Sequence, residues 1–290
     1  MNNAARFPRM EPKHAGAPAP DTSRSISRKS LMIKLVAALA GLVTLCGCAS
    51  AQPSREPKAT TVVLVHGAFA ESASWDGVIT KLERDGYGVV AVANPLRGVQ
   101  TDAEYVGRVV ASINGPVVLV GHSYGGSVIS DPAAATANVK SLVFVAAFAP
   151  DAGETAADLA GRFPGSTLGQ ALAPPVPLPG GGHDLYINQE KFPAQFAADV
   201  PEAEAARMAA TQRPIRESAL NEPERAPSWK HLPSWFVYGT ADRNIPPEAH
   251  AFMAERARSR GTQVVDGASH VLMISHPDNV AAVIEAAAGE

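Results

Sequence analysis

The chain has 290 residues, with 25 Lys and Arg, 28 Asp and Glu, and only two Cys. Removing residues 1–51 takes away both Cys, seven of the basic residues and two of the acidic ones, which leaves 18 basic and 26 acidic residues and a net charge of −8. Such a composition excludes disulfides and thiolate metal sites from residues 52–290, and it disfavours nucleic acid or an anionic membrane surface as a partner. The length suits one α/β domain with an insertion.

Residues 1–51 are predicted to be an export signal. A basic segment at 24–34 precedes an apolar run at 35–46, which is too short to span a bilayer comfortably. Ala49-Ser50-Ala51 then matches a cleavage site of the Ala-x-Ala type. We therefore expect an exported protein that is periplasmic or secreted.

A second processing route stays open, because Leu45-Cys46-Gly47-Cys48 resembles a lipoprotein box. In that case Cys48 would be acylated, and its lipid would be the protein's contact with a membrane. Under either route, residues 52–59 are interpreted as a linker and residues 60–290 as the folded domain.

The folded domain alternates short apolar runs with amphipathic segments. Buried strands are predicted at 60–65, 89–93, 117–120, 141–147, 234–238 and 262–265. Helices are predicted at 74–85, with Ser74 as the N-cap, at 102–113, at 202–210, from 246 or 247 to about 258, and at 277–288. Strands and helices that alternate in this way predict an α/β fold with a mostly parallel, doubly wound sheet, which binds ligands beyond the carboxyl ends of its strands.

Residues 152–233 interrupt this alternation. They are rich in Pro, Gly and Ala and include the runs 174–179 and 180–182. The segment is too long for a loop, so we expect a lid inserted over the active site. Its larger apolar residues could line a substrate pocket or form only the lid's own core: Leu159, Phe163, Leu185, Tyr186, Phe192, Phe196 and Met208.

The segment from 117 to 126 has the strongest chemical signal. An apolar run leads into a Gly121-His-Ser123-Tyr-Gly125 turn, and a helix of small residues follows. A strand that runs directly into a helix leaves the residue at the tip of the turn accessible and strained, with glycines on either side because a Cβ would not fit. Ser123 is therefore the predicted nucleophile.

Asp242 and His270 follow Ser123 in a Ser, Asp, His order. Because a serine hydroxyl is a poor nucleophile at neutral pH, His270 would accept its proton and return it to the leaving group, while Asp242 would orient the imidazole. Asp151, at the end of an earlier strand, is the alternative acid. Asp266 is too close to His270 in sequence to orient it easily.

These motifs resemble those of the α/β-hydrolase-fold serine hydrolases, and the resemblance runs from residue 60 to the C-terminus. It is carried by Val65-His-Gly-Ala68 with a following Ser-Trp, by the turn around Ser123, and by Asp242 and His270. The chain is most similar to a branch of small esterases that includes plant methyl esterases and hydroxynitrile lyases. The related lyases carry a Lys directly after the histidine that corresponds to His270, where this chain has Val271, which disfavours lyase activity.

The resemblance also implies an oxyanion hole. In many α/β hydrolases a His-Gly turn after the first strand presents a backbone N–H to the substrate oxygen, and by that match the amide of Ala68 is one donor. The second donor would be the amide of Tyr124, the residue after the nucleophile. His66 is expected to hydrogen-bond the loop backbone.

The other histidines show no spacing typical of metal ligands, and surface or loop roles are expected for them: His122, His183, His250 and His276 among others. We therefore expect a cofactor-independent hydrolase of small carboxylic esters that acts through an acyl-enzyme. A lactonase, an amidase or a perhydrolase would use the same three residues. A hydroxynitrile lyase and a non-catalytic binding protein are less favoured alternatives.

Overall fold

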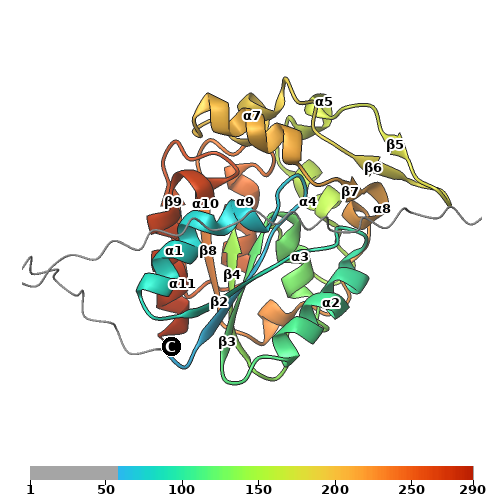
Figure 1. Cartoon of the computed structure of the whole chain (residues 1–290). Coiled ribbons are helices and arrows are strands. Elements are labelled where there is room, and N and C mark those ends of the chain that lie inside the picture. Colours follow the sequence, from blue (N-terminus) through green and yellow to red (C-terminus); the bar gives the residue numbers. More distant parts are fainter. Residues whose placement is uncertain (1–57, 290) are drawn as a thin grey trace, which may run out of the picture. The chain divides into compact units, whose positions relative to one another are not determined.

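The computed structural model of the chain describes residues 58–289 (Figure 1). The predicted export signal, its lipid anchor on Cys48 and most of the linker at 52–59 lie outside these residues. Within the described part of the chain, no helix is long and apolar enough to cross a membrane.

A six-stranded parallel sheet forms the centre of residues 58–289. Its strands are β1 (Thr61–Val65), β2 (Gly88–Val92), β3 (Val117–His122), β4 (Val139–Val145), β8 (Ser234–Gly239) and β9 (Gly261–Val265). They lie in the order β2-β1-β3-β4-β8-β9, and every neighbouring pair is parallel. Every residue of β3 is buried, which explains its continuous apolar sequence. The predicted α/β, doubly wound, mostly parallel sheet is confirmed.

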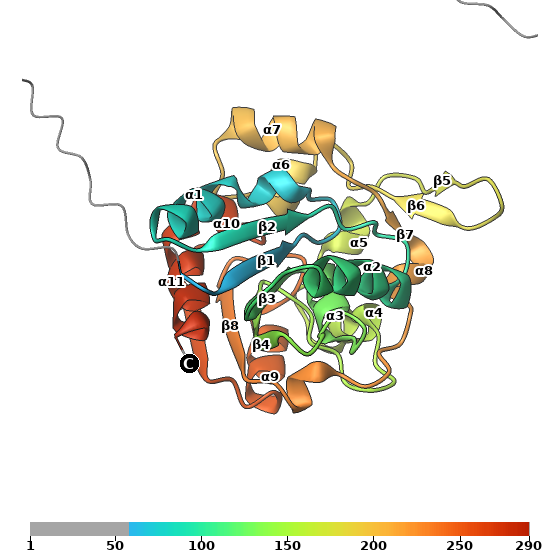
Figure 2. The ribbon, with the colours of Figure 1, turned by 60° about the horizontal axis from the view of Figure 1, so that its bottom comes forward.

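Helices cover both faces of the sheet (Figure 2). On one face α1 (Asp76–Arg84) packs against α11 (Pro277–Ala288), and α11 also packs on β4 and β8. On the other face lie α2 (Val99–Ala111), α3 (Tyr124–Ser130) and α9 (Pro247–Arg256). Two short elements complete this part of the fold, the 3-10 turn η1 (Ser72–Trp75) and α10 (Leu272–Ser275).

Two predicted helix starts are wrong. Helix α1 begins at Asp76, because the preceding residues form the 3-10 turn η1 and the Ser74 hydroxyl accepts a hydrogen bond from the Glu71 amide instead of capping α1. Helix α2 begins three residues earlier than predicted, at Val99. The Glu222 carboxylate caps this end by accepting from the amides of Val99 and Gln100.

The segment 152–233 lies between β4 and β8 in sequence and contains most of the short elements. Its helices are α4 (Ala156–Arg162), α5 (Leu168–Ala171), α6 (Phe192–Phe196), α7 (Glu202–Thr211), α8 (Glu217–Leu220) and the 3-10 turn η2 (Ser228–Lys230). It also forms a three-stranded antiparallel sheet of β5 (Val176–Pro177), β6 (His183–Leu185) and β7 (Ile215–Arg216), which the sequence did not predict. Figure 1 shows α5 and α7 above the sheet. We refer to this segment as the lid.

Candidate active site

Ser123 occupies the sharp turn between β3 and α3. Its backbone has φ 54° and ψ −123°, a conformation that side chains rarely adopt. A Cβ added at Gly121 would lie 2.5 Å from the Gly125 carbonyl oxygen, and one added at Gly125 would lie 2.5 Å from the Val65 carbonyl oxygen. Glycine is therefore required on both sides of Ser123, for the steric reason that the sequence suggested.

The side chains of Ser123, His270 and Asp242 form a continuous hydrogen-bonded chain. His270 Nε2 lies 2.9 Å from Ser123 Oγ, and His270 Nδ1 lies 2.7 Å from Asp242 Oδ2. Because a carboxylate only accepts, Nδ1 carries the proton of the neutral ring and Nε2 accepts the serine proton. The fold thus brings together three residues that are widely separated in sequence.

Asp242 is buried in a dense set of hydrogen-bond donors. Its Oδ1 accepts from the amides of Asn244 and Ile245 at 2.8 and 3.0 Å, and its Oδ2 contacts His250 Nε2 at 3.2 Å as well as His270. Burial alone would raise the pKa of Asp242, but the charge of His270 and the hydrogen bonds from both imidazoles outweigh it and hold that pKa well below its usual range. The carboxyl group is therefore ionised at neutral pH.

The two other candidate acids have different partners. The Asp151 carboxylate forms an ion pair with Lys230 and accepts from the amide of Ala152 at 2.6 Å. The Asp266 carboxylate accepts from Thr240 Oγ1 at 3.0 Å. Within residues 58–289, the structure brings Asp242 to the imidazole of His270 and leaves both alternatives paired elsewhere.

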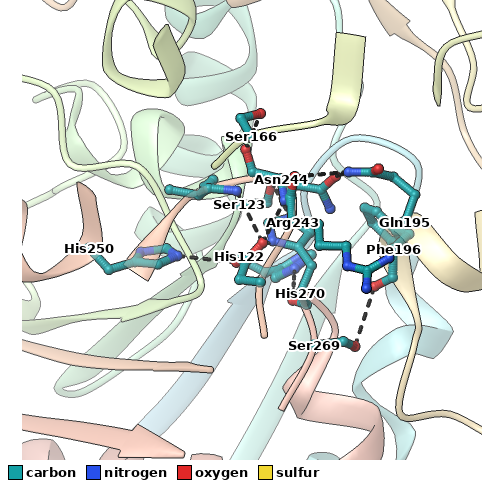
Figure 3. A network of polar contacts seen from close by, with 12 residues as sticks. His122, Ser123, Ser166, Gln195, Phe196, Arg243, Asn244, His250, Ser269 and His270 are labelled. Carbon is teal, nitrogen blue, oxygen red and sulfur yellow. Dashed lines mark hydrogen bonds and ion pairs between the residues drawn. The ribbon is translucent and has the colours of Figure 1, made fainter. Parts of the chain in front are cut away.

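The lid holds the turn that carries Asp242 (Figure 3). Gln195, on α6, donates from Nε2 to the Arg243 carbonyl oxygen at 2.9 Å and to Asn244 Oδ1 at 2.8 Å. Ser166 Oγ donates to the Asn244 carbonyl oxygen at 2.9 Å, and the Thr167 amide donates to the Arg243 carbonyl oxygen at 3.0 Å. The position of the acid therefore depends on the lid as well as on the sheet, which the sequence did not indicate.

Ala68 and Tyr124, whose amides are the expected donors, line the same cavity as Ser123 and His270. Neither N–H donates a hydrogen bond to any group within residues 58–289. Tyr124 is the first residue of α3, where an amide has no acceptor inside the helix. A Cβ at Gly67 would lie 2.5 Å from Ser123 Cβ, so the turn that carries Ala68 lies directly against the serine. Both free donors are thus available to a ligand bound at Ser123.

His66 holds this turn in place, as expected. Its Nδ1 lies 2.9 Å from the Gly67 carbonyl oxygen, and its Nε2 accepts from the Asn94 amide at 3.1 Å. Asn94 returns a bond from its side-chain Nδ2 to the His66 carbonyl oxygen at 2.9 Å. Burial lowers the pKa of His66 to about 4, so the ring is neutral and joins two loops.

The side chain of Tyr124 has a partner that the sequence analysis missed. Its hydroxyl donates to Asp102 Oδ2 at 2.9 Å, and Asp102 also accepts from the Arg97 amide at 3.0 Å. Burial raises the pKa of both Tyr124 and Asp102. The pair anchors Tyr124 beside the cavity. The sequence carried no signal for this pair, because an acidic residue in the first turn of a helix is common.

The expectation of surface or loop roles is wrong for two of the other histidines. His122 and His250 are buried, at 0% and 1% exposure, and burial lowers the pKa of both. His122 Nε2 lies 3.1 Å from the His270 carbonyl oxygen, and His250 contacts Asp242. His250 belongs to the buried stripe of α9 with Ala249, Met253 and Ala254, a spacing that could have revealed it.

A cavity of about 60 Å³ adjoins Ser123. Besides Ser123, His270, Asn244 and the two amide-bearing residues, it is lined by apolar side chains: Phe69, Phe148, Ala156, Ala157, Ala160, Leu168, Phe196, Leu220 and Ile245. Of the lid residues considered above, Phe196 lines this cavity, whereas Leu159 and Phe192 are buried in the core. A larger hollow of about 390 Å³ between α1 and α7 contains none of the three residues of the hydrogen-bonded chain.

No group of three or more His, Cys, Asp or Glu side chains within residues 58–289 is arranged to hold a metal ion. The site consists of a serine, an imidazole and an ionised carboxylate in contact, two free amides and an apolar cavity without Lys, Arg, Asp or Glu. This arrangement can transfer a proton from Ser123 to His270 and can stabilise an oxyanion beside the serine.

The chain is similar to proteins of known activity or structure. It is 26% identical over 240 residues to an alpha-hydroxynitrile lyase from Arabidopsis thaliana, which covers 75% of this chain and 93% of the lyase. Among solved structures, polyneuridine aldehyde esterase matches with a TM-score of 0.67 and 18% identity over 80% of this chain and all of the esterase. A pyrethroid hydrolase from Sphingobium faniae JZ-2 matches with a TM-score of 0.62 and 23% identity, over 79% of this chain and 98% of the other.

A family model supplies the wider relationship. It is described as the alpha/beta hydrolase family, and it matches residues 62–283, which include every strand of the central sheet except the first residue of β1. The resemblance inferred from the sequence motifs is confirmed at this level, and the lyase relative agrees with the branch that they indicated. This chain belongs to the alpha/beta hydrolase family.

Proposed function

We propose that the protein hydrolyses small, uncharged carboxylic esters through an acyl-enzyme, with Ser123, His270 and Asp242 as its catalytic triad. The observation that carries the proposal is the unbroken chain of contacts from Ser123 Oγ through both nitrogens of His270 to the ionised Asp242. The names of esterase and hydrolase relatives agree with ester hydrolysis.

In the first half of the proposed reaction, Ser123 Oγ bonds to the acyl carbon while its proton moves to His270 Nε2. The amides of Ala68 and Tyr124 donate to the oxyanion that forms. The C–O bond to the alcohol then breaks, and the alcohol leaves with the proton from Nε2. In the second half, a water loses its proton to Nε2 and attacks the acyl carbon, and the carboxylic acid leaves as Ser123 regains its proton.

The cavity limits the substrate. A cavity of about 150 Å³ is enough to bind benzene, whereas the one beside Ser123 measures about 60 Å³. Its lining has no charged side chain to pair with a substrate charge, and an unpaired charge is costly to bury. We therefore propose short, apolar acyl groups, with larger esters admitted only if the lid moves.

Lactonase, amidase and perhydrolase activities would use the same residues, and they are the alternatives to ester hydrolysis at this site. The similarity to a hydroxynitrile lyase makes cyanohydrin cleavage the competing reaction class. Cyanide departure would leave a negative charge to be stabilised. Val271, next to His270, is fully buried and apolar, and no Lys or Arg lines the cavity. This disfavours the lyase reaction.

The test is a panel of p-nitrophenyl esters of rising chain length, assayed beside mandelonitrile with one preparation of protein. We expect hydrolysis of the shortest esters at rates far above cyanide release, each corrected for spontaneous breakdown. Ser123→Ala should abolish ester turnover while the protein stays folded. Serine-dependent cyanide release without ester turnover would overturn the proposal.

Export is also a proposal, resting on the sequence of residues 1–51. Mass spectrometry of the mature N-terminus distinguishes the two processing routes, since an acylated N-terminal Cys48 indicates a lipoprotein and a free Gln52 indicates cleavage after Ala51. Recovery of the uncleaved chain from the cytoplasm would contradict both routes.

A further inference from the structure

His250 contacts the buried acid but does not contact the nucleophile. It lies on α9 and is 1% exposed, and its Nε2 is 3.2 Å from Asp242 Oδ2. The same oxygen accepts from His270 Nδ1 at 2.7 Å. One carboxylate oxygen is therefore shared by two imidazoles, of which only one reaches Ser123.

The ring of His250 is held on several sides. It stacks on Tyr238 of β8, with ring centroids 4.8 Å apart and an interplanar angle of 19°. The backbone carbonyl of Ala147, after β4, also lies within the reach of the ring. The ionisable groups that act on or contact His250 are thus Asp242, His270 and Tyr238.

The acceptors around His250 decide which of its ring nitrogens carries the proton. Burial lowers the pKa of His250, and the nearby charge of His270 lowers it further, although Asp242 opposes both. A neutral ring has one N–H to donate, and it faces one carboxylate and one peptide carbonyl. The carboxylate is the stronger acceptor, so the proton belongs on Nε2, directed at Asp242.

We infer that His250 is a positioning residue for the proposed ester hydrolysis, donating its Nε2 proton to Asp242 Oδ2 and fixing that oxygen for His270. The inference rests on the proposed function of the same site. His250 touches neither the substrate cavity nor Ser123, so it acts only through the carboxylate.

Two consequences separate this role from simple packing. Without the second donor, Oδ2 keeps only its bond to His270, while two amides still hold Oδ1. Oδ2 is then less firmly fixed, and proton transfer from Ser123 loses part of its alignment. The charge on Oδ2 also becomes fully available to His270, which favours the protonated form of His270 and raises the pH at which the enzyme becomes active. His122, the other ring beside His270, is held neutral by burial and does not change this balance.

The first test uses the unaltered whole chain with 15N-labelled histidine. NMR should show two buried imidazoles that are protonated on Nε2 and do not titrate between about pH 5 and 9, because His122 Nε2 donates to the His270 carbonyl oxygen and His250 Nε2 donates to Asp242. The signal that is absent from the His250→Gln spectrum belongs to His250. A proton on Nδ1 of His250, or its titration in that range, would overturn the inference. This result does not depend on whether esters are the substrate.

The second test compares two substitutions at the same position. His250→Gln keeps a side-chain N–H that can reach Asp242, whereas His250→Phe keeps an aromatic ring for Tyr238 but has no donor. We expect His250→Phe to lower kcat about 10- to 100-fold, with KM changed less than about twofold and the acid limb of kcat/KM moved upward by roughly half a pH unit or more. His250→Gln should restore most of both values.

Thermal unfolding of each variant controls for packing. Equal losses of kcat in both variants, or an unmoved acid limb in a folded His250→Phe, would contradict the inference. If His250→Phe does not fold, the tautomer seen by NMR decides. If Ser123→Ala retains full ester turnover, the proposed function fails, and that failure is recognised independently of His250.

Discussion

Asp242 in the site and Glu224 in the lid are both buried carboxylates, but they differ in how many hydrogen bonds they accept. Asp242 accepts from two amides and two imidazoles, and its pKa lies far below normal. Glu224 is 3% exposed, but only one of its oxygens accepts, from the Arg225 amide at 2.9 Å. Its Oε2 has no hydrogen-bond partner among residues 58–289.

Burial and the nearby charge of Asp131 raise the pKa of Glu224 to about 7, although the Arg225 amide opposes them. Burial therefore does not decide whether a carboxyl group is charged, and the number of donors around it does. Asp242 is thus kept ionised by its hydrogen-bond donors, whereas ionisation of Glu224 in the lid lowers the stability of the folded protein.

The largest expected effect concerns Asp242, the carboxylate with more hydrogen-bond donors. Asp242→Asn should lower kcat about 10³- to 10⁴-fold with little change in KM, because an amide at this position no longer holds His270 in the tautomer that accepts from Ser123. Asp151→Asn is the matched control, since its partner is Lys230, and it should cost less than about threefold. Steady-state kinetics on one ester would measure both. The reverse ranking would assign the acid to the end of β4.

The second prediction concerns stability and pH. A glutamate with an unfolded pKa of 4.5 and a folded pKa of about 7 binds its proton more tightly in the folded protein. The free energy of unfolding should then fall as pH rises from about 4.5 to about 7, by an amount on the order of 2–3 kcal/mol. Glu224→Gln should remove most of that fall.

Urea unfolding of the wild type and of Glu224→Gln at pH 5 and at pH 8 would measure this difference. The exposed Glu190 provides a matched control, because Glu190→Gln should leave the pH dependence unchanged. If Glu224→Gln loses the same stability at both pH values, Glu224 is held by ordinary packing and the comparison with Asp242 fails.

The third prediction concerns the buried carboxylate of Asp102, which loses its hydrogen bond from the Tyr124 hydroxyl in Tyr124→Phe. Removing the hydroxyl takes one donor from Asp102 and should lower the free energy of unfolding by about 1–2 kcal/mol. We expect kcat to fall less than about tenfold, because the Tyr124 amide stays in the chain. Tyr105, exposed on α2, is the control: Tyr105→Phe should change neither thermal stability nor kcat. A variant of Tyr124 as stable as wild type would show that the bond contributes nothing.

The smallest effect concerns the cavity rather than a charge. Ala160, on α4, lines the space beside Ser123, so Ala160→Leu should narrow it. We expect the ratio of kcat/KM for a butyrate ester to that for an acetate ester to fall about tenfold. Ala206→Leu, on the exposed face of α7, should leave the ratio unchanged. An unchanged ratio in Ala160→Leu would indicate that the acyl group binds in another part of the site.

The sequence by itself determined the strands, the sharp turn at Ser123 and the order of the candidate residues. These features depend on neighbours in the chain: buried parallel strands need continuous apolar runs, and the turn needs glycine at 121 and 125 because backbone oxygens lie 2.5 Å from where a Cβ would stand. Asp242 could be preferred over Asp151 from its turn motif alone.

Only the tertiary structure decided what surrounds these residues. The start of α2 is set by Glu222, which is 123 positions from the amide that it caps, and the small sheet of the lid consists of pairs too short to leave a pattern. The contacts of His122 and His250 with the site were equally hidden, although the spacing of apolar residues in α9 could have indicated that His250 is buried. The physical reason is the same in each case. Hydrogen bonds between segments that are distant in sequence form only when the chain folds, and the local sequence does not indicate which donor meets which acceptor.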